Sequence, residues 1–155
     1  MRKGRVLWLA AVVIAVSLAV FGCGKKQVVK PSDEAVAASR AVGAFMGMEK
    51  AYKQRDAAGV TGPVSPNFKP GYSEFLSGIR KDMEAFSKVD LEVETERVEI
   101  EGDDVKVVFH WRGFWTDKSG RKNEGRGNAV FVFRETGGQM SLYDVLGDSP
   151  FGVAR

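Results

Sequence analysis

The stretch YSEFLSGIRKDMEAFSKVDLEVETERVEI, residues 72–100, is the most informative part of the sequence about the fold, because the spacing of its apolar residues changes halfway along. In the first half, apolar residues recur every three or four positions, which is the period of an amphipathic helix. They are Tyr72, Phe75, Leu76, Ile79, Met83 and Phe86. From Val89 onward apolar residues alternate with acidic ones, which is the period of a half-buried strand. We therefore expect a helix over about residues 72–87 that leads directly into a strand.

Further strand patterns follow this stretch toward the C-terminus. Odd positions from Val105 to Trp115 form one apolar face of the next expected strand. A change of parity near Glu96 and Arg97 predicts a bulge, which would curve the sheet. Later strands are expected at about residues 125–134 and 139–146, with turns at 101–104, 117–120 and 135–138.

A second helix is expected on the N-terminal side. Ser32 is a suitable N-cap, and Asp33 and Glu34 would complement the dipole of the first helical turn. The apolar stripe of this helix comprises Ala38, Val42, Phe45, Met48 and Tyr52. Beyond Asp56 the chain is rich in Pro and Gly, so only a short helical turn is expected there. The whole pattern predicts an α+β fold, with N-terminal helices packed on a curved antiparallel sheet of about four strands.

The N-terminus has the features of an export signal. Basic residues at positions 2, 3 and 5 precede an uncharged apolar run, Val6 to Phe21, which is shorter than the roughly 20 residues of a membrane span. The run ends at Gly22 and Cys23, the only cysteine of the chain. The stretch Val20 to Cys23 resembles the lipobox of bacterial lipoproteins, in which the cysteine receives a diacylglycerol and becomes the mature N-terminus. The alternative is an uncleaved apolar helix that ends in cysteine by chance.

These features divide the chain into a signal peptide at residues 1–22, a lipidated tether at 23–31 and one domain at 32–155. We expect a lipid-anchored, periplasm-facing protein of the bacterial cell envelope. Gly24 after the cysteine favours the outer membrane in a Gram-negative host. Three tether lysines, at positions 25, 26 and 30, would either face anionic headgroups or belong to an ordinary solvated linker.

The charge balance argues against nucleic-acid binding. Three of the 23 Lys and Arg residues precede Cys23, so the mature chain would carry as many basic as acidic side chains. No interleaving of basic and aromatic residues indicates a nucleic-acid surface. With a single histidine, and with the single cysteine lipidated, a zinc site of Cys and His ligands is excluded, and no cofactor motif is present.

The order of elements, together with several residues of the first helix, resembles the nuclear-transport-factor-2-like (NTF2-like) superfamily, which includes polyketide-cyclase-like and ketosteroid-isomerase-like proteins. The matching residues are Phe45, Ala51, Tyr52, Asp56, Val60 and Phe68, with the closing stretch 138–145. The resemblance implies a cone-shaped sheet around helices, with a pocket at the open end. Met48 occupies the position of the isomerase-like tyrosine, and the Pro/Gly-rich stretch at 63–70 replaces the segment that supplies the general base. The resemblance therefore supports the fold and weakens the isomerase assignment.

Two polar residues are the candidates for chemistry. Asp144 shares strand parity with Met140, Leu142 and Leu146, so it is expected on a largely apolar face. His110 could act as a general base beside it, because a nearby carboxylate raises the pKa of an imidazole. The alternatives are an ion pair of Asp144 with Arg112 or Arg126, and a solvated or packed His110.

A ligand pocket needs apolar walls with a few polar groups. The pocket candidates are Tyr52, Trp111, Arg112, Trp115, Met140 and Leu142. We expect an accessory or small-ligand-binding domain rather than an enzyme, with a small apolar ligand, an envelope protein or a second copy as the partner. The alternatives are a hydro-lyase or isomerase that uses Asp144 and His110, and an envelope assembly component whose exposed sheet contacts other proteins.

Overall fold

The computed structural model describes residues 31–154. The predicted signal peptide and the lipidation site at Cys23 lie outside the described residues. Within residues 31–154, no helix is both long enough and apolar enough to cross a membrane.

The helices form where the sequence predicts them. They are α2 (Asp33–Lys53), the short α3 (Ala57–Thr61) and α4 (Tyr72–Ala85). The Ser32 side chain accepts a hydrogen bond from the Ala35 amide at 3.1 Å, which confirms its role as the N-cap of α2. Asp56 caps α3 in the same way, accepting from the Gly59 amide at 3.0 Å.

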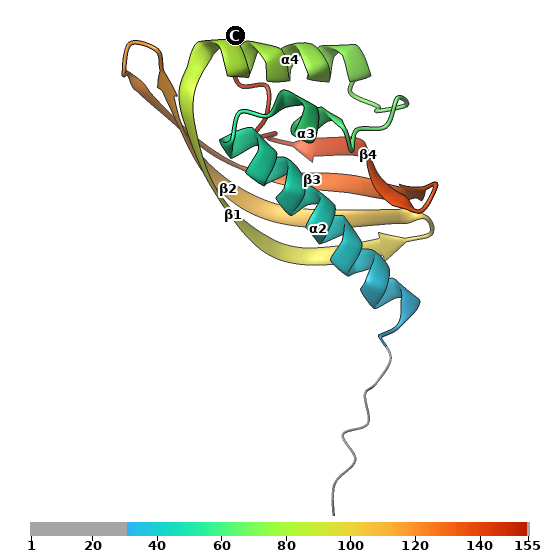
Figure 1. The fold of residues 1–155 in the computed structure, drawn as a ribbon. Helices are drawn as coiled ribbons and strands as arrows, with labels where there is room; N and C mark the ends of the chain where they lie inside the picture. The colour runs from blue at the N-terminus through green and yellow to red at the C-terminus, as the bar shows by residue number, and fades with distance from the viewer. Residues whose placement is uncertain (1–30, 155) are drawn as a thin grey trace, which may run out of the picture. The chain divides into compact units, whose positions relative to one another are not determined.

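The four strands form one antiparallel sheet in the order β1-β2-β3-β4. Their bounds are Phe86–Glu101, Asp104–Asp117, Lys122–Thr136 and Gln139–Gly147. Figure 1 shows that the sheet is curved and that the helices lie against one of its faces, which we name the inner face. The predicted α+β fold is confirmed, as is the bulge near Arg97, where the β1 register shifts between Thr95 and Arg97.

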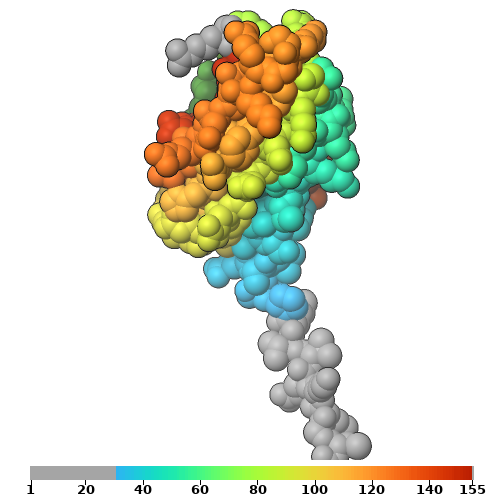
Figure 2. Space-filling model, turned by 90° about the vertical axis from the view of Figure 1, so that its left-hand side faces the viewer, coloured from blue at the N-terminus to red at the C-terminus, as the bar shows by residue number. Residues whose placement is uncertain are grey.

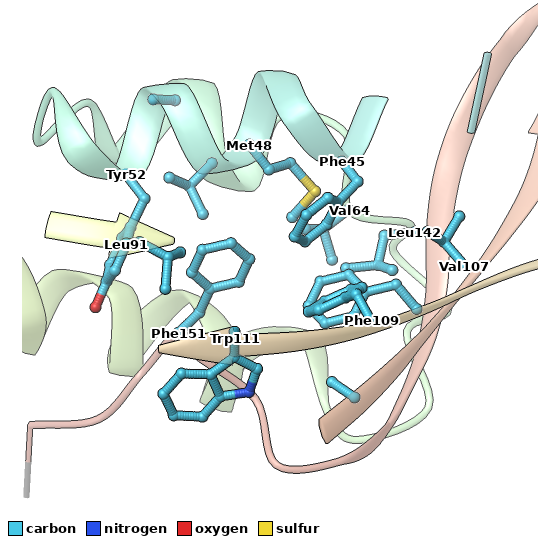
Figure 3. Close-up of a cluster of buried hydrophobic side chains, with 14 of the residues drawn as sticks. Phe45, Met48, Tyr52, Val64, Leu91, Val107, Phe109, Trp111, Leu142 and Phe151 are labelled. Atoms are coloured by element: carbon cyan, nitrogen blue, oxygen red, sulfur yellow. The ribbon is translucent and has the colours of Figure 1, made fainter. Parts of the chain in front are cut away.

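The hydrophobic core lies between α2, α4 and the inner face of the sheet. Phe45 of α2 contacts Phe109 of β2 and Phe131 of β3, with ring centroids 4.3 and 5.2 Å away. Figure 3 shows Met48 and Tyr52 on the same side of α2, pointing toward the sheet. These side chains are at most 1% exposed, so the helix stripe and the odd positions of β2 bury each other.

A bulge in β4 changes which face Asp144 occupies. Leu142 pairs with Phe133, but Asp144 pairs with Val132, because the register shifts between Val132 and Phe133. Phe133 belongs to the core, whereas Val132 is buried apart from it, on the outer face of the sheet. The expectation that Asp144 shares a face with Leu142 is therefore wrong, because the extra residue reverses the alternation.

The two edges of the sheet differ. The loop before α4 runs along β4, where the Leu142 amide donates to the Pro63 carbonyl and the Leu142 carbonyl accepts from the Ser65 amide. The Lys69 amide adds a third bond, to the Tyr143 carbonyl. Figure 2 shows the other edge, strand β1 (yellow-green), running between the rest of the sheet and α2 (teal).

Candidate functional site

An open groove lies at one end of the domain, between the β2–β3 hairpin, the end of α4 and residues 148–154, which we name the C-terminal segment. Its volume is about 750 Å³. The apolar lining includes Phe86, Trp111, Trp115 and Val153. The charged lining includes Glu84, Asp117, Lys118, Arg121 and Glu124. Apolar walls with a charged rim are typical of small-ligand sites.

Glycines in the sheet make room for the two tryptophan rings of the groove. A Cβ added at Gly113 would lie 2.2 Å from the Trp115 ring, and one at Gly127 would lie 3.0 Å from the Trp111 ring. Gly113 pairs with Gly125, whose added Cβ would also crowd Trp115. The indoles therefore lie close to the sheet backbone, where larger side chains would displace them. The two rings meet edge to face, with centroids 6.0 Å apart.

A chain of hydrogen bonds leads from the groove into the core. The Trp115 indole N–H donates to the Tyr52 hydroxyl at 2.9 Å. That hydroxyl in turn donates to Oδ2 of Asp82, on α4, at 2.7 Å. Burial raises the pKa of Tyr52 well above its usual range, and the neighbouring negative charge of Asp82 raises it further. Tyr52 therefore stays protonated and acts as a donor to Asp82.

Asp82 also holds the C-terminal segment in place. Its oxygens accept hydrogen bonds from the Gly152 amide at 2.6 Å and the Ala154 amide at 2.7 Å. Between these anchors and the end of β4, the Phe151 ring enters the core, and Figure 3 shows it pointing toward α2. The Trp111 indole N–H adds a bond of 2.7 Å to the Asp148 carbonyl. The C-terminal segment thus forms part of the core and part of the groove wall.

The buried polar groups of this cluster are fully paired. Throughout residues 31–154, every buried side-chain nitrogen and oxygen has a hydrogen-bond partner. The same residues contain no group of three or more His, Cys, Asp or Glu side chains placed to hold a metal ion. The cluster of Tyr52, Asp82 and Trp115 therefore has the properties of a structural network, in which each polar side chain has a hydrogen-bond partner.

The hairpin that forms the groove rim is fixed by Asp117. Its carboxylate accepts from the Ser119 hydroxyl at 2.6 Å and from the Arg121 guanidinium at 2.8 Å. The Ser119 hydrogen bond, followed by the Arg121 contacts, holds the pKa of Asp117 well below its usual range. The carboxylate is thus ionised at neutral pH and keeps Arg121 at the rim.

The structure brings three of the pocket candidates together and separates the others. Tyr52, Trp111 and Trp115 lie in or directly behind the groove. Leu142 is fully buried in the core, and Met140 lies near the start of α2, beside a second, smaller cavity. Arg112 lies on the outer face, where its guanidinium is 2.9 Å from Glu124.

The two candidates for chemistry lie on the outer face and do not meet. His110 is half exposed, with Nε2 3.2 Å from Glu96. Asp144 pairs with Lys69 at 3.1 Å rather than with Arg112 or Arg126. In the sheet register, Asp144 on β4 is level with Lys106 on β2, which is two strands away. Lys106 is in turn four residues from His110 along β2.

Sequence reasoning missed Asp82 and Phe151. A signal for Asp82 was present, because it lies three residues after Ile79 and four before Phe86, on the apolar stripe of α4. A carboxylate at a core position of a helix indicates a buried network. Phe151 follows the last strand with no periodic pattern around it, so only the structure reveals its role.

No known family description matches this sequence, and no curated protein matches it. Solved structures do match. An NTF2-like superfamily protein from Salmonella enterica superposes with a TM-score of 0.65 at 14% identity, covering 76% of this chain and 93% of that one. A ketosteroid isomerase-like protein from Erwinia carotovora superposes with a TM-score of 0.60 at 18% identity, covering 73% of this chain and 97% of that one.

An NTF2-like protein of unknown function from Shewanella oneidensis superposes with a TM-score of 0.57 at 12% identity, covering 73% of this chain and 99% of that one. At these identities the likeness shows the fold alone. The neighbours have different descriptions, and the fold is compatible with ligand binding as well as with isomerase-like chemistry. The domain described here has the NTF2-like fold.

Proposed function

We propose that this protein is a lipid-anchored binding protein of the bacterial cell envelope, whose groove takes a small, planar, apolar molecule. The observation that carries this proposal is the pair of tryptophans on the groove floor. Sheet glycines clear the space for both indoles, and charged hairpin residues surround them. Aromatic stacking contributes about 0.5–1.5 kcal/mol per ring pair beyond the burial of area.

Binding fits the groove better than catalysis does. A general acid or base must exchange a proton with the substrate, within hydrogen-bond reach. Tyr52 donates to Asp82, and its raised pKa keeps the proton on the hydroxyl. Asp82 already accepts three hydrogen bonds. The groove thus offers an apolar floor, in which Trp111 and Trp115 are 8% and 3% exposed, and charged side chains for orientation.

The anchor part of the proposal rests on Cys23 and on the apolar run before it. Residues 24–32 separate the cysteine from α2, and fully extended they would reach about 30 Å. The three tether lysines would add roughly 1 kcal/mol each near an anionic surface. The acylated chain would carry its groove close to the membrane, where apolar molecules concentrate.

The groove is tested with 2-naphthol as the probe and tryptophan fluorescence as the measurement. We expect saturable quenching in the unlipidated Cys23→Ser protein. In the same background Trp111→Phe should weaken binding by about five- to tenfold, since about 1 kcal/mol of stacking is lost. Phe114→Leu, on the outer face, is the matched control and should bind as the parent does. Absence of saturable quenching, or equal binding by both variants, would refute the groove assignment.

The anchor is tested separately by growth with radiolabelled palmitate. The parent chain should incorporate the label and Cys23→Ser should not. Label that persists in the Cys23→Ser variant would contradict lipidation at this residue.

A second candidate function is protein contact through the outer face of the sheet. This face carries ion pairs between neighbouring strands, including Arg112 with Glu124 and His110 with Glu96, on side chains that are about half exposed. Such a surface suits a partner with complementary charge, as an envelope assembly component would need. The enzyme alternative with Asp144 and His110 is less favoured, because the two residues lie apart on this face.

A further inference from the structure

The place occupied by the Phe151 ring has the features of a ligand site filled by the chain itself. Four aromatic rings surround Phe151, with centroid distances of 4.9 Å to Tyr52, 5.8 Å to Phe131, 6.4 Å to Phe75 and 6.5 Å to Phe45. Phe151 is 4% exposed, although the next residue, Gly152, is on the surface. A single side chain of an irregular terminal segment therefore fills a position enclosed by helices and sheet.

The polar end of this position is the carboxylate of Asp82, which has no cationic partner among residues 31–154. Asp82 is 1% exposed. Its charge is compensated by three neutral donors, and two of them, the Gly152 and Ala154 amides, belong to the C-terminal segment. A buried carboxylate is stabilised most by a cation with good geometry, so these amides are weaker partners than an ammonium group would be.

The C-terminal segment is also attached in a way that allows it to leave without unfolding the sheet. It follows the last strand and adds no strand to the ladder. Besides Phe151, the hydrogen bonds that hold it are the two to Asp82, the bond from Trp111 to the Asp148 carbonyl, and one backbone bond from the Asp148 amide to the Asn128 carbonyl of β3. Terminal segments with few backbone bonds open at lower free energy than core strands do.

We propose that the C-terminal segment occupies, in cis, a binding site for an arylalkyl ammonium ligand. The ligand ring would replace Phe151 among the four aromatic rings, and its ammonium group would replace the Gly152 and Ala154 amides on Asp82. This site lies behind the groove and takes a different ligand, and the segment that would leave it also forms part of the groove wall.

The experiment compares 2-phenylethylammonium with two ligands of similar shape, neutral ethylbenzene and anionic phenylacetate. It uses the unlipidated Cys23→Ser protein carrying Phe151→Ala, which vacates the ring position and weakens the hold of the segment. We expect 2-phenylethylammonium to bind at least about tenfold more tightly than either control, and to bind more weakly to the protein that retains Phe151. Adding Asp82→Asn should abolish the preference for the cation. Equal affinity for the cation and ethylbenzene would overturn the proposal, because it would show an apolar cavity alone.

A second measurement covers the case in which Phe151→Ala does not fold. Hydrogen exchange of the Gly152 and Ala154 amides is followed in the protein that retains Phe151, with and without 2-phenylethylammonium. We expect both amides to exchange faster with the ligand, while amides of β2 and β3 stay protected. Unchanged exchange at saturating ligand would overturn the proposal. Trp111→Phe removes the bond to the Asp148 carbonyl, so both amides should exchange faster even without ligand, but the further acceleration by 2-phenylethylammonium should remain. Loss of naphthol binding and loss of amine binding are therefore separate results.

Discussion

The inner and outer faces of the sheet are built from alternate residues of the same strands, yet their polar groups behave differently. On β2, Phe109, Trp111 and Trp115 point inward, whereas His110 and Arg112 point outward. Polar groups on the inner side, such as the Tyr52 hydroxyl, are satisfied by fixed neutral donors and acceptors. Those on the outer side form ion pairs that water competes with. Burial, rather than residue type, therefore determines how much each polar group contributes to the free energy of unfolding.

The largest difference between the faces should appear when an aromatic ring is removed. Phe109→Ala should lower the free energy of unfolding by about 3–5 kcal/mol, because the residue is fully buried and its loss leaves a cavity. Phe114→Ala, five residues further along β2 and on the outer face, should cost about 1 kcal/mol, since the ring is only partly buried. Urea unfolding of both variants checks this, and equal losses would show that aromatic rings on the two faces contribute equally to stability.

The next effect concerns the buried carboxylate. Asp82→Ala should cost about 2–4 kcal/mol, because it leaves the Tyr52 hydroxyl and two backbone amides without their acceptor. Thermal unfolding and urea unfolding measure the loss. Glu124→Ala, which removes an exposed carboxylate at the groove rim from its ion pair with Arg112, is the control and should cost less than about 1 kcal/mol. If Asp82→Ala lowered the free energy of unfolding no more than the control does, the hydrogen-bond network would not stabilise the core.

Asp144 is intermediate in burial between Asp82 and Glu124. Its side chain is 11% exposed, but its partner Lys69 is 62% exposed, so solvent screens the pair. We expect Asp144→Asn to change the free energy of unfolding by no more than about 1 kcal/mol. Lys69→Met should have a similarly small effect. A loss of several kcal/mol in Asp144→Asn would show that this carboxylate behaves like Asp82 despite its place on the outer face.

The smallest effect is expected at His110. His110→Gln keeps a polar side chain beside Glu96 and should change stability by less than about 0.5 kcal/mol, as for most exposed positions. Binding of 2-naphthol should also be unchanged, because the histidine lies on the outer face. Loss of naphthol binding in a folded His110→Gln protein would show that the outer face affects the groove. It would then favour the enzyme alternative.

The sequence predicted the fold because hydrophobic period is a strong local signal in this chain. The change of period near residue 87 placed α4 and β1, and the parity shift near Glu96 located a real bulge. The second bulge, in β4, escaped notice because Leu142 and Asp144 keep an ordinary two-residue spacing in the sequence. Only the pairing with Val132 and Phe133 reveals it.

The candidate site was harder to predict, because its parts come from distant segments. The tryptophans were identified from their shared strand face, but their contacts with Tyr52 depend on how α2 crosses the sheet. Phe151 joins the core through long-range packing that no local pattern encodes. Asp82 was overlooked because a charged residue on an amphipathic helix is usually assumed to face water, although its spacing from Ile79 indicated otherwise.

The covered edge at β4 has a consequence for how copies of this protein meet at high local concentration. With the loop over β4, β1 is the edge of the described sheet at which another strand could add. Acidic residues recur along β1, at positions 90, 92 and 94 among others. Two copies approaching edge to edge would bring these like charges together, and the repulsion opposes the growth of a continuous intermolecular sheet. The alternating pattern of β1 thus has two roles. Its apolar residues specify the fold, and its acidic residues oppose polymerisation of crowded copies through this edge.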